Sequence, residues 1–392
     1  MTREAAVFIT LIAYKVTLIV IGILARRKTR DGLDFFLGGR ALGPTVAALS
    51  ASASSSSAWT LLGVSGAAYA WGVSALWLFP ACVGGFVLNW YVLAPALQRL
   101  SHRSGALTVT EILAGPPGRP LSWTLSRVAS FIVLVSLGTY VASQFQGAGK
   151  TFSETFGLSL SASILLGSGV VVLYTLLGGF WAVSLTDTLQ GLVMAGTSLI
   201  LPLSALAAIG GPSGFLNGLG QLETGGYLSL TRNLAPVAGL GFILGLLGIG
   251  LGYPGQPHVV NRFMALREGS ASLRRARLIA IGWAIIVYSG MLLLGLCGRI
   301  LYPQLLDREV VFIVAAKELF PAVLSGVMLA AVLSAIMSTA DSQLLVAASS
   351  VTHDLRLGGP TAGSLLLRSR VVVLVLSLGA VFAALLGSQE IF

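Results

Sequence analysis

The chain has 392 residues, of which 55% are hydrophobic and only 10% are charged, and its mean hydropathy is +0.89. Soluble domains carry about 25% charged residues, so this composition excludes an ordinary soluble protein and indicates a membrane protein. The net charge of +10 reflects a bias of basic residues to one side of the membrane, and it does not indicate nucleic-acid binding.

Repeated apolar runs of about 20 residues predict transmembrane helices. We expect an all-α polytopic membrane protein of about ten spans, without soluble domains. The spans cover residues 5–25, 43–70, 72–98, 122–149, 158–177, 180–208, 235–261, 276–301, 321–350 and 369–387. The first span is not a signal peptide, because no basic segment precedes it and a basic cluster follows it at Arg26, Arg27, Lys28 and Arg30.

Loop charge predicts the orientation, because basic residues favour cytoplasmic loops. The odd-numbered gaps hold 17 of the 24 basic residues. They are Arg26, Arg27, Lys28, Arg30, Arg40, Arg99, Arg103, Arg119, Arg127, Arg262, Arg267, Arg274, Arg275, Arg277, Arg356, Arg368 and Arg370. Lys15 lies inside the first span, and the other basic residues lie on the opposite side. We therefore expect the N-terminus outside.

The remaining segments give few signs of other chemistry. The longest extramembrane stretch is expected at about residues 210–233, and a short amphipathic helix at Glu309–Leu319, both outside. Cys82 and Cys297 fall in spans, so no disulfide framework is implied. No nucleophile–base pair, metal-ligand spacing or ring of filter residues is visible, so we expect no enzyme, metal centre or channel.

Two spans carry sequences that favour interrupted helices. Span two contains S-A-S-A-S-S-S-S-A-W from Ser50 to Trp59, and span seven contains G-I-G-L-G-Y-P-G-Q-P-H from Gly248 to His258. Serine and glycine are weak helix formers, and proline removes a backbone donor. The two spans lie five apart in order, which is typical of an inverted repeat whose binding site lies at the breaks. We predict breaks near Ala53–Ser57 and Gly250–Gln256.

Span nine carries a polar cluster within A-I-M-S-T-A-D-S-Q-L-L-V-A-A-S-S, from Ala335 to Ser350. Ser338, Thr339 and Asp341 fall within one helical turn and all offer oxygen atoms, which hard cations prefer. Polar groups are costly inside a membrane, so the cluster predicts a functional site. It indicates an ion-coupled transporter.

Several long motifs resemble the sodium:solute symporter family, and most closely its sodium/proline symporters. They are F-F-L-G-G-R-A-L-G-P at Phe35–Pro44, A-L-S-A-S-A at Ala48–Ala53, G-A-L-T-V at Gly105–Val109, G-G-F-W-A-V-S-L-T-D-T-L-Q at Gly178–Gln190, G-L-G-Y-P-G-Q-P-H and R-F-M-A within Gly250–Ala265, and M-S-T-A-D-S-Q-L-L at Met337–Leu345. The likeness extends from about residue 5 to residue 387.

The resemblance implies a LeuT-like inverted-repeat bundle with one extra helix at residues 5–25. The first repeat would cover residues 43–208 and the second, lacking its last helix, residues 235–387 within a single transporter domain, residues 1–392. Sodium, the coupling ion, would bind backbone carbonyls of Ala53, Ser56 and Ala335 and the hydroxyls of Ser338 and Thr339. No other cofactor is implied. Asp187 matches a family aspartate near the sodium exit route.

By the same resemblance, the substrate pocket would include Trp59, Tyr140, Tyr253 and Pro257, with Gln256 as an added polar contact. Aromatic walls suit an apolar ring, and helix N-termini inside a broken span suit a carboxylate.

The sequence departs from the family pattern at three places. Proline symporters carry a sodium-related aspartate at the position of Ser55, and Asp341 is a candidate to supply that charge instead. Ile249 stands where proline symporters place a pocket tryptophan. The chain ends at Phe392, after the ninth core helix.

We therefore expect sodium-coupled symport of a small solute, proline or a related amino or organic acid, by alternating access across a bacterial plasma membrane. Two alternatives remain open at this stage. One is a transporter-like domain that only senses solute, and the other is a truncated, inactive symporter.

Overall fold

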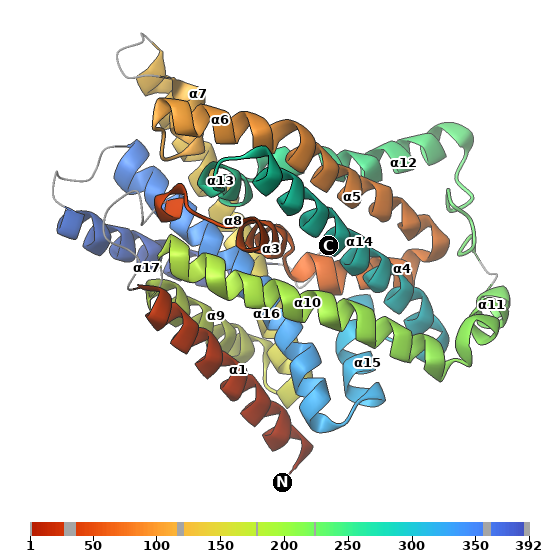
Figure 1. Ribbon diagram of the computed structural model, residues 1–392. Coiled ribbons are helices and arrows are strands. Elements are labelled where there is room, and N and C mark those ends of the chain that lie inside the picture. Colours follow the sequence, from red (N-terminus) through yellow and green to blue (C-terminus); the bar gives the residue numbers. More distant parts are fainter. Residues whose placement is uncertain are drawn as a thin grey trace.

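The computed structural model describes residues 2–26, 37–115, 121–177, 179–222, 225–355 and 362–387. These residues are almost all helical and contain no β-strand (Figure 1). Eight helices among them are long and apolar enough to cross a membrane. An all-α polytopic architecture is therefore confirmed, whereas the count of ten spans stays a prediction.

Helices cover all ten predicted apolar runs. The longer ones are α1 (Arg3–Arg26), α3 (Pro44–Ser55), α4 (Val64–Trp71), α5 (Leu78–Leu88), α6 (Ala94–Ser104), α8 (Ser122–Phe156), α9 (Leu160–Leu177), α10 (Phe180–Ala208), α12 (Pro236–Leu251), α13 (Pro257–Ala265), α14 (Ser270–Leu301), α16 (Ala322–Ser349) and α17 (Ala362–Leu386). Between or beside them lie η1 (Gly38–Arg40), η2 (Trp59–Gly63), η3 (Gly72–Trp77), η4 (Asn89–Leu93), α7 (Val109–Ala114), α11 (Gly211–Gln221), η5 (Tyr253–Gly255), η6 (Arg308–Val310), α15 (Val311–Leu319) and η7 (Ser350–Asp354).

The first predicted break is confirmed between α3 and η2. Helix α3 ends at Ser55, and Ser56 adopts an extended conformation with φ −117° and ψ 91°. The amide of Ser56 donates to the carbonyl of Ala53 at 3.1 Å, and the chain becomes helical again from Trp59 through α4. Consecutive serines weaken the helix because their hydroxyls compete for backbone groups.

The second predicted break is confirmed between α12 and α13. Helix α12 ends at Leu251, a short turn follows at Tyr253–Gly255, and Gln256 is non-helical with φ −100° and ψ 89°. Pro257 then opens α13, in the first-turn position where a missing amide donor costs nothing.

The two broken helices contact each other directly and are joined by backbone hydrogen bonds at their ends. The amide of Leu42, just before α3, donates to the carbonyl of Ala265 at the end of α13 at 3.1 Å, and the amide of Arg267 donates to Leu42 at 3.0 Å. Helix α3 contacts α10, α13, α14 and α16, so it lies in the middle of the molecule (Figure 1).

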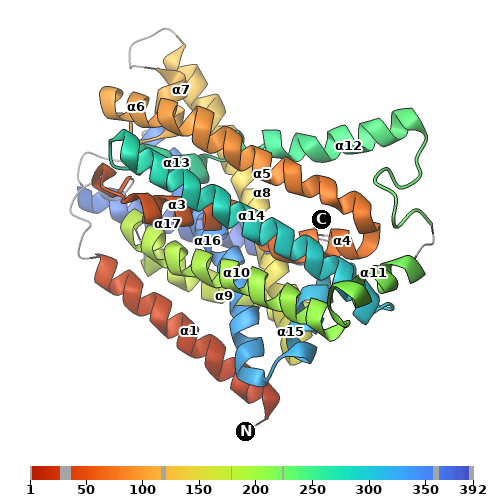
Figure 2. The ribbon, with the colours of Figure 1, turned by 45° about the vertical axis from the view of Figure 1, so that its right-hand side comes forward.

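Helix α12 packs on α5 at one edge of the bundle, opposite α1 (Figure 2). A Cβ atom on Gly250 would collide with the carbonyl of Ala81, so only glycine permits this close approach.

The extramembrane segments agree with the sequence in part. The short helix predicted at Glu309–Leu319 is present as η6 and α15, with the Asp307 carboxylate accepting from the amide of Glu309 at 2.9 Å, and its location outside the membrane stays a prediction. The stretch at residues 210–233, expected only as an extramembrane connection, contains helix α11, whose first turn holds Pro212. Of the predicted loop cations and motif residues, Arg27, Lys28, Arg30, Phe35, Arg119, Gly178 and Arg356 lie outside the described residues, as does Phe392.

Candidate functional site

The first break contacts the polar turn of α16 through side chain to backbone hydrogen bonds. The Ser338 hydroxyl lies 3.0 Å from the carbonyl oxygen of Ala53 and 3.4 Å from that of Ala335. The Thr339 hydroxyl donates to the carbonyl of Ser54 at 3.1 Å. The structure thus brings together four residues of the predicted sodium set, and Ser56 joins them because its amide donates a hydrogen bond to the carbonyl of Ala53.

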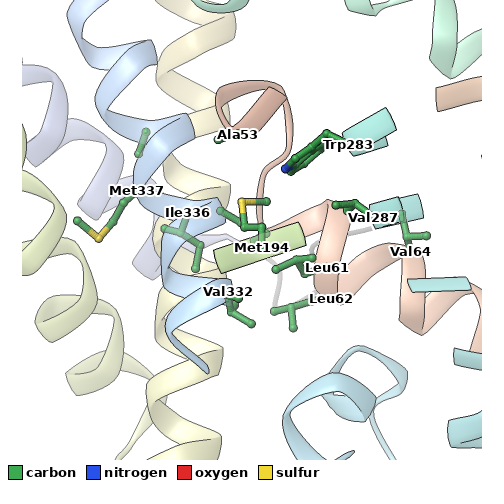
Figure 3. Close-up of a cluster of buried hydrophobic side chains, with 14 of the residues drawn as sticks. Ala53, Leu61, Leu62, Val64, Met194, Trp283, Val287, Val332, Ile336 and Met337 are labelled. Atoms are coloured by element: carbon green, nitrogen blue, oxygen red, sulfur yellow. The ribbon is translucent and has the colours of Figure 1, made fainter. Parts of the chain in front are cut away.

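Apolar side chains cover this contact on the side toward α4. Figure 3 shows Leu61, Leu62, Met194, Val332 and Ile336 gathered below Ala53, with Trp283 and Val287 of α14 beside them. All of these side chains are buried. A cation at the Ala53–Ser338 contact would therefore find no polar path in that direction among them.

On the other side of the same contact lies a buried ion pair. Arg262 in α13 donates through Nη2 to Oδ2 of Asp187 in α10 at 2.9 Å. The hydroxyls of Ser50 and Ser54 in α3 also donate to this oxygen, at 2.9 and 3.0 Å. Since a buried charge is costly unless it is paired and hydrogen-bonded, this arrangement joins three helices through one carboxylate.

The position of Arg262 corrects one sequence expectation. We counted it among the basic loop residues, but it is only 1% exposed and its guanidinium lies over the ring of Phe180. Counting loop charges cannot separate an arginine at the end of a span from one that turns inward to meet a carboxylate 75 residues away.

Asp341 lies next to this network without a direct bond to Arg262. Its Oδ1 atom accepts from the Ser342 hydroxyl at 3.2 Å, and Arg262 donates to the same hydroxyl at 2.6 Å. The Oδ2 atom is buried and has no hydrogen-bond partner among the described residues. From α1, Lys15 contacts the side chain of Met337, one turn before Asp341.

A cavity of about 450 Å³ lies between the two breaks and α8. It is lined by Ser55, Trp59, Tyr140, Ser143, Gln144, Ile249, Gly252, Tyr253 and Gln256. The lining combines aromatic rings with hydroxyl and amide groups, which is the usual character of a small-molecule site. Four of the five predicted substrate residues line it, whereas Pro257 is not among the lining residues and opens α13.

Ser55 faces this cavity rather than the Ala53–Ser338 contact. Its hydroxyl donates to the carbonyl of Ser52 at 2.9 Å, within the last turn of α3. In a helix end, adjacent residues point in different directions. A sodium-related role for Ser55 would therefore act from the cavity side.

Sequence reasoning missed two cavity residues on α8. Gln144 lines the cavity and accepts from the amide of Ala58 at 3.0 Å, which satisfies a donor that the break leaves free. Ser143 lies beside it. The available signal was spacing, because Tyr140, Ser143 and Gln144 stand at positions i, i+3 and i+4 and share one face of an otherwise apolar helix.

Comparison with known proteins adds a family. The family described as "Sodium:solute symporter family" matches residues 35–392. The osmoregulated proline transporter OpuE of Bacillus subtilis (strain 168) is 37% identical over 355 residues, which cover 89% of this chain and 70% of OpuE. A sodium/proline symporter of Staphylococcus aureus (strain JH9) is 36% identical over 355 residues, covering 88% of this chain and 67% of that protein.

Solved structures share the fold. A Na+-coupled sialic acid symporter, in a substrate-bound outward-open state, superposes with a TM-score of 0.79 at 19% identity and covers 97% of this chain and 82% of its own. MhsT in complex with L-phenylalanine superposes with a TM-score of 0.61 at 12% identity, covering 87% of this chain and 79% of its own. At these identities the likeness concerns the arrangement of helices.

Proposed function

The chain belongs to the sodium:solute symporter family, and from that membership we propose that it couples the inward flow of sodium to the uptake of proline or a closely related amino acid. Two relatives that cover most of the chain are described as proline transporters. The single observation that carries the proposal is the contact of the Ser338 and Thr339 hydroxyls with the carbonyls of the first break, beside a solute-sized cavity.

The proposed sodium ligands are the carbonyls of Ala53, Ser56 and Ala335 and the hydroxyls of Ser338 and Thr339. In the structure, these hydroxyls donate to the carbonyls of Ala53 and Ser54. Sodium would separate the two partners and accept lone pairs from both, because a hard cation prefers oxygen ligands. The site would then exchange hydrogen bonds for ion contacts without a large movement of helices.

Asp187 and Asp341 are proposed to act beyond the ligand set, on the side of the Asp187–Arg262 ion pair. Arg262 forms an ion pair with Asp187 and also donates to the Ser342 hydroxyl, which donates to Asp341. A sodium ion that leaves the Ala53–Ser338 contact meets hydroxyls and carboxylates here and an apolar layer on the other side. We assign the Asp187 side to the sodium exit.

The solute is proposed to bind in the cavity between the two breaks. Trp59, Tyr140 and Tyr253 supply aromatic surface for a ring, and Gln256 supplies a buried amide oxygen that has no partner among the described residues. We also assign Gln144, Ser143 and Ile249 to this pocket. Pro257 acts as the residue that starts α13, and Ser55 borders the solute rather than the ion.

For topology, we propose a bacterial plasma-membrane protein with its N-terminus outside. Residues 5–25 would form a separate first helix, and residues 43–208 and 235–387 two repeats, the second without its last helix; in alternating access the bundle would rock against the scaffold helices. An inside-negative membrane potential of 100 mV then contributes about 2.3 kcal/mol for each sodium ion.

Uptake by proteoliposomes tests this function. Vesicles carrying the chain receive radiolabelled L-proline with an inward sodium gradient, or with an equal choline gradient as the control. We expect accumulation only with sodium, and a further increase with an inside-negative potential. Sodium-dependent binding without uptake would favour the sensor alternative. If the chain neither binds nor takes up proline, then proline is excluded as the solute.

A further inference from the structure

Three of the arginines that the charge pattern places outside gather around two aromatic rings of α4. The guanidinium carbons of Arg232 and Arg308 lie 5.9 and 5.8 Å from the centre of the Trp71 ring. The guanidinium carbon of Arg299, near the end of α14, lies 5.1 Å from the centre of the Tyr69 ring. Basic residues favour the cytoplasmic side of a membrane protein, so a cluster of arginines on the other side calls for an explanation.

A second cavity, of about 170 Å³, lies beside these rings. It is lined by Ala70, Trp71, Leu222, Gly225, Gly226, Tyr227, Arg232 and Arg299. None of these lining residues carries a negative charge, whereas two of them are arginines. Arg232 is exposed and Arg299 is half-buried, so a charged ligand from solution can reach the cavity.

The loop that carries Arg232 is fixed to the end of α4. A Cβ atom on Gly72 would lie 2.1 Å from the carbonyl oxygen of Tyr227, and the φ of Gly72 is +64°, so only glycine allows this close approach. The same carbonyl accepts from the amide of Val73 at 2.9 Å, and the Tyr227 hydroxyl donates to the carbonyl of Ala68 at 3.1 Å. The wall of the cavity is therefore backbone that is anchored to α4, in addition to long side chains.

The two arginines of this cavity keep hydrogen-bond donors for a ligand. A guanidinium group has five N–H donors. Arg299 uses one of them for the carbonyl of Pro303 at 3.1 Å, and Arg232 lies over the rings of Trp71 and Phe242. Among the residues that the structure describes, neither arginine has a carboxylate within ion-pairing distance. An anion with several oxygen atoms would satisfy these donors, because guanidinium groups bind such oxygens in pairs.

We propose that this cavity binds a phosphate group, held by Arg232 and Arg299 on the side predicted to be outside. A carboxylate offers two oxygens in one plane, which a single arginine satisfies, whereas a phosphate offers three acceptor oxygens and up to two negative charges. Two sources share this chemistry, namely free inorganic phosphate and the headgroup of an anionic lipid. The site shares no lining residue with the solute cavity, so the inference does not depend on the proposed transport.

The position of the site gives bound phosphate a structural consequence. Arg232 lies just before Pro236, where α12 begins and leads into the second break, and Arg299 lies near the end of α14. A phosphate held by both arginines would tie the start of α12 to α14 with charge-assisted hydrogen bonds. A ligand that binds only the folded chain raises its stability, so binding should be visible as a higher unfolding midpoint.

The test measures the thermal unfolding midpoint of the purified full chain in detergent, while choline chloride is replaced by choline phosphate at fixed pH, sodium concentration and ionic strength. We expect phosphate to raise the midpoint of the unmodified chain by about 2–4 °C. Arg232→Gln combined with Arg299→Gln should lose most of this rise. Arg274→Gln combined with Arg275→Gln removes two exposed arginines at the other end of α14 and should keep it. This control accounts for the general stabilising effect of phosphate on proteins.

Lipid nanodiscs distinguish the two sources. If the ligand is a free anion, inorganic phosphate raises the midpoint in discs of phosphatidylcholine. If it is a headgroup, discs of phosphatidylglycerol raise the midpoint without added phosphate. Either result supports the proposal when the rise is lost in the variant that lacks both cavity arginines. Arg232→Gln alone, at an exposed position, covers the case in which that variant does not fold.

Two results would overturn the proposal. The first is a midpoint that responds equally to phosphate and to phosphatidylglycerol in the cavity variants and in the Arg274 and Arg275 control, or does not respond at all. The second concerns Glu223, which lies outside the described residues and close in sequence to Leu222 and Gly225. A rise that appears only in Glu223→Gln would mean that a carboxylate of the chain itself, and no added phosphate, satisfies the two arginines.

Discussion

The two broken helices reach the same geometry with different residues, and they satisfy their free backbone groups in different ways. At the first break, side chains do this work, since Ser57 Oγ accepts from the amide of Trp59 and Gln144 accepts from that of Ala58. At the second break, short backbone bonds dominate, with the amides of Gly255 and Gln256 donating to Gly252 and Tyr253.

This difference indicates a division of labour between the breaks. Hydroxyl groups can satisfy a break from within, so the first one can be buried among helices and still offer oxygen to an ion. A break made with glycine and proline lacks such side chains, and the amide oxygen of Gln256 beside it has no partner in the described part of the chain. The first break therefore suits the cation and the second suits the solute.

The largest effect is expected from removing the buried guanidinium of Arg262 beside the first break. Arg262→Met leaves the carboxylate of Asp187 without its ion pair, and such a loss typically costs ~3–5 kcal/mol. We expect a strong decrease in the thermal unfolding midpoint in detergent and loss of uptake. Asp187→Asn combined with Arg262→Met should regain much of the stability, because no unpaired charge remains. Equal midpoints for the single and double variants would contradict this reading of the network.

The next effect concerns sodium at the first break. Ser338→Ala with Thr339→Ala removes two of the proposed sodium ligands, and each hydroxyl should contribute about 1 kcal/mol. The sodium concentration for half-maximal uptake should therefore rise about tenfold to thirtyfold. Ser349→Ala is the matched control, since this hydroxyl also lies on α16 but, among the residues that the structure describes, bonds to the carbonyl of Val346 in its own helix. If the sodium dependence of uptake is unchanged in the double variant, sodium does not bind at the Ala53–Ser338 contact.

A smaller effect separates the second break from the first. Gln256→Ala removes the amide oxygen that has no partner among the described residues, and the loss of its proposed hydrogen bond to the solute should cost about 1 kcal/mol. We expect the solute concentration for half-maximal uptake to rise about fivefold, with little change in sodium dependence at saturating solute. Gln221→Ala in α11, which is exposed, serves as the control. If Gln256→Ala changed only the sodium concentration for half-maximal uptake, the assignment of solute to the second break and sodium to the first would be wrong.

The smallest effect is expected on stability, from an ionisable group that lies outside both breaks. Burial raises the pKa of Glu111 in α7, but a bond to His353 and bonds from the amides of Leu107 and Thr108 outweigh it, so its pKa is lowered. The carboxylate therefore stabilises the fold above the usual glutamate pKa of about 4.3, and this contribution is lost as pH falls through the lowered value.

Because the Glu111 side chain is 39% exposed, solvent screening should keep the effect of Glu111→Gln below about 1 kcal/mol. Unfolding midpoints measured between about pH 3 and 7 should differ most from the unmodified chain near neutral pH and converge in acid. Glu318→Gln on α15, where the side chain is exposed, should show a smaller difference. A difference that grows toward acid pH would have the wrong sign for a lowered pKa.

Much of this protein follows from local sequence. Apolar runs predict the helices, because backbone groups in a membrane must be satisfied within the same segment. The serine run and the Gly/Pro run predict the two breaks, because they weaken a helix wherever they occur. The hydroxyls of Ser338 and Thr339 were recognisable for a similar reason, since a polar turn within an apolar span is costly without a function.

Tertiary structure decided which of these groups meet. Arg262 turns inward to Asp187, Ser55 faces the cavity instead of the Ala53–Ser338 contact, and Tyr288 in α14 meets the hydroxyl of Tyr253 at the second break. Each of these facts depends on the rotation of one helix against another and on partners far apart in the chain. A rotation of about 100° per residue separates neighbours on a helix, so the sequence identifies the residues of a break but not the direction in which each one points.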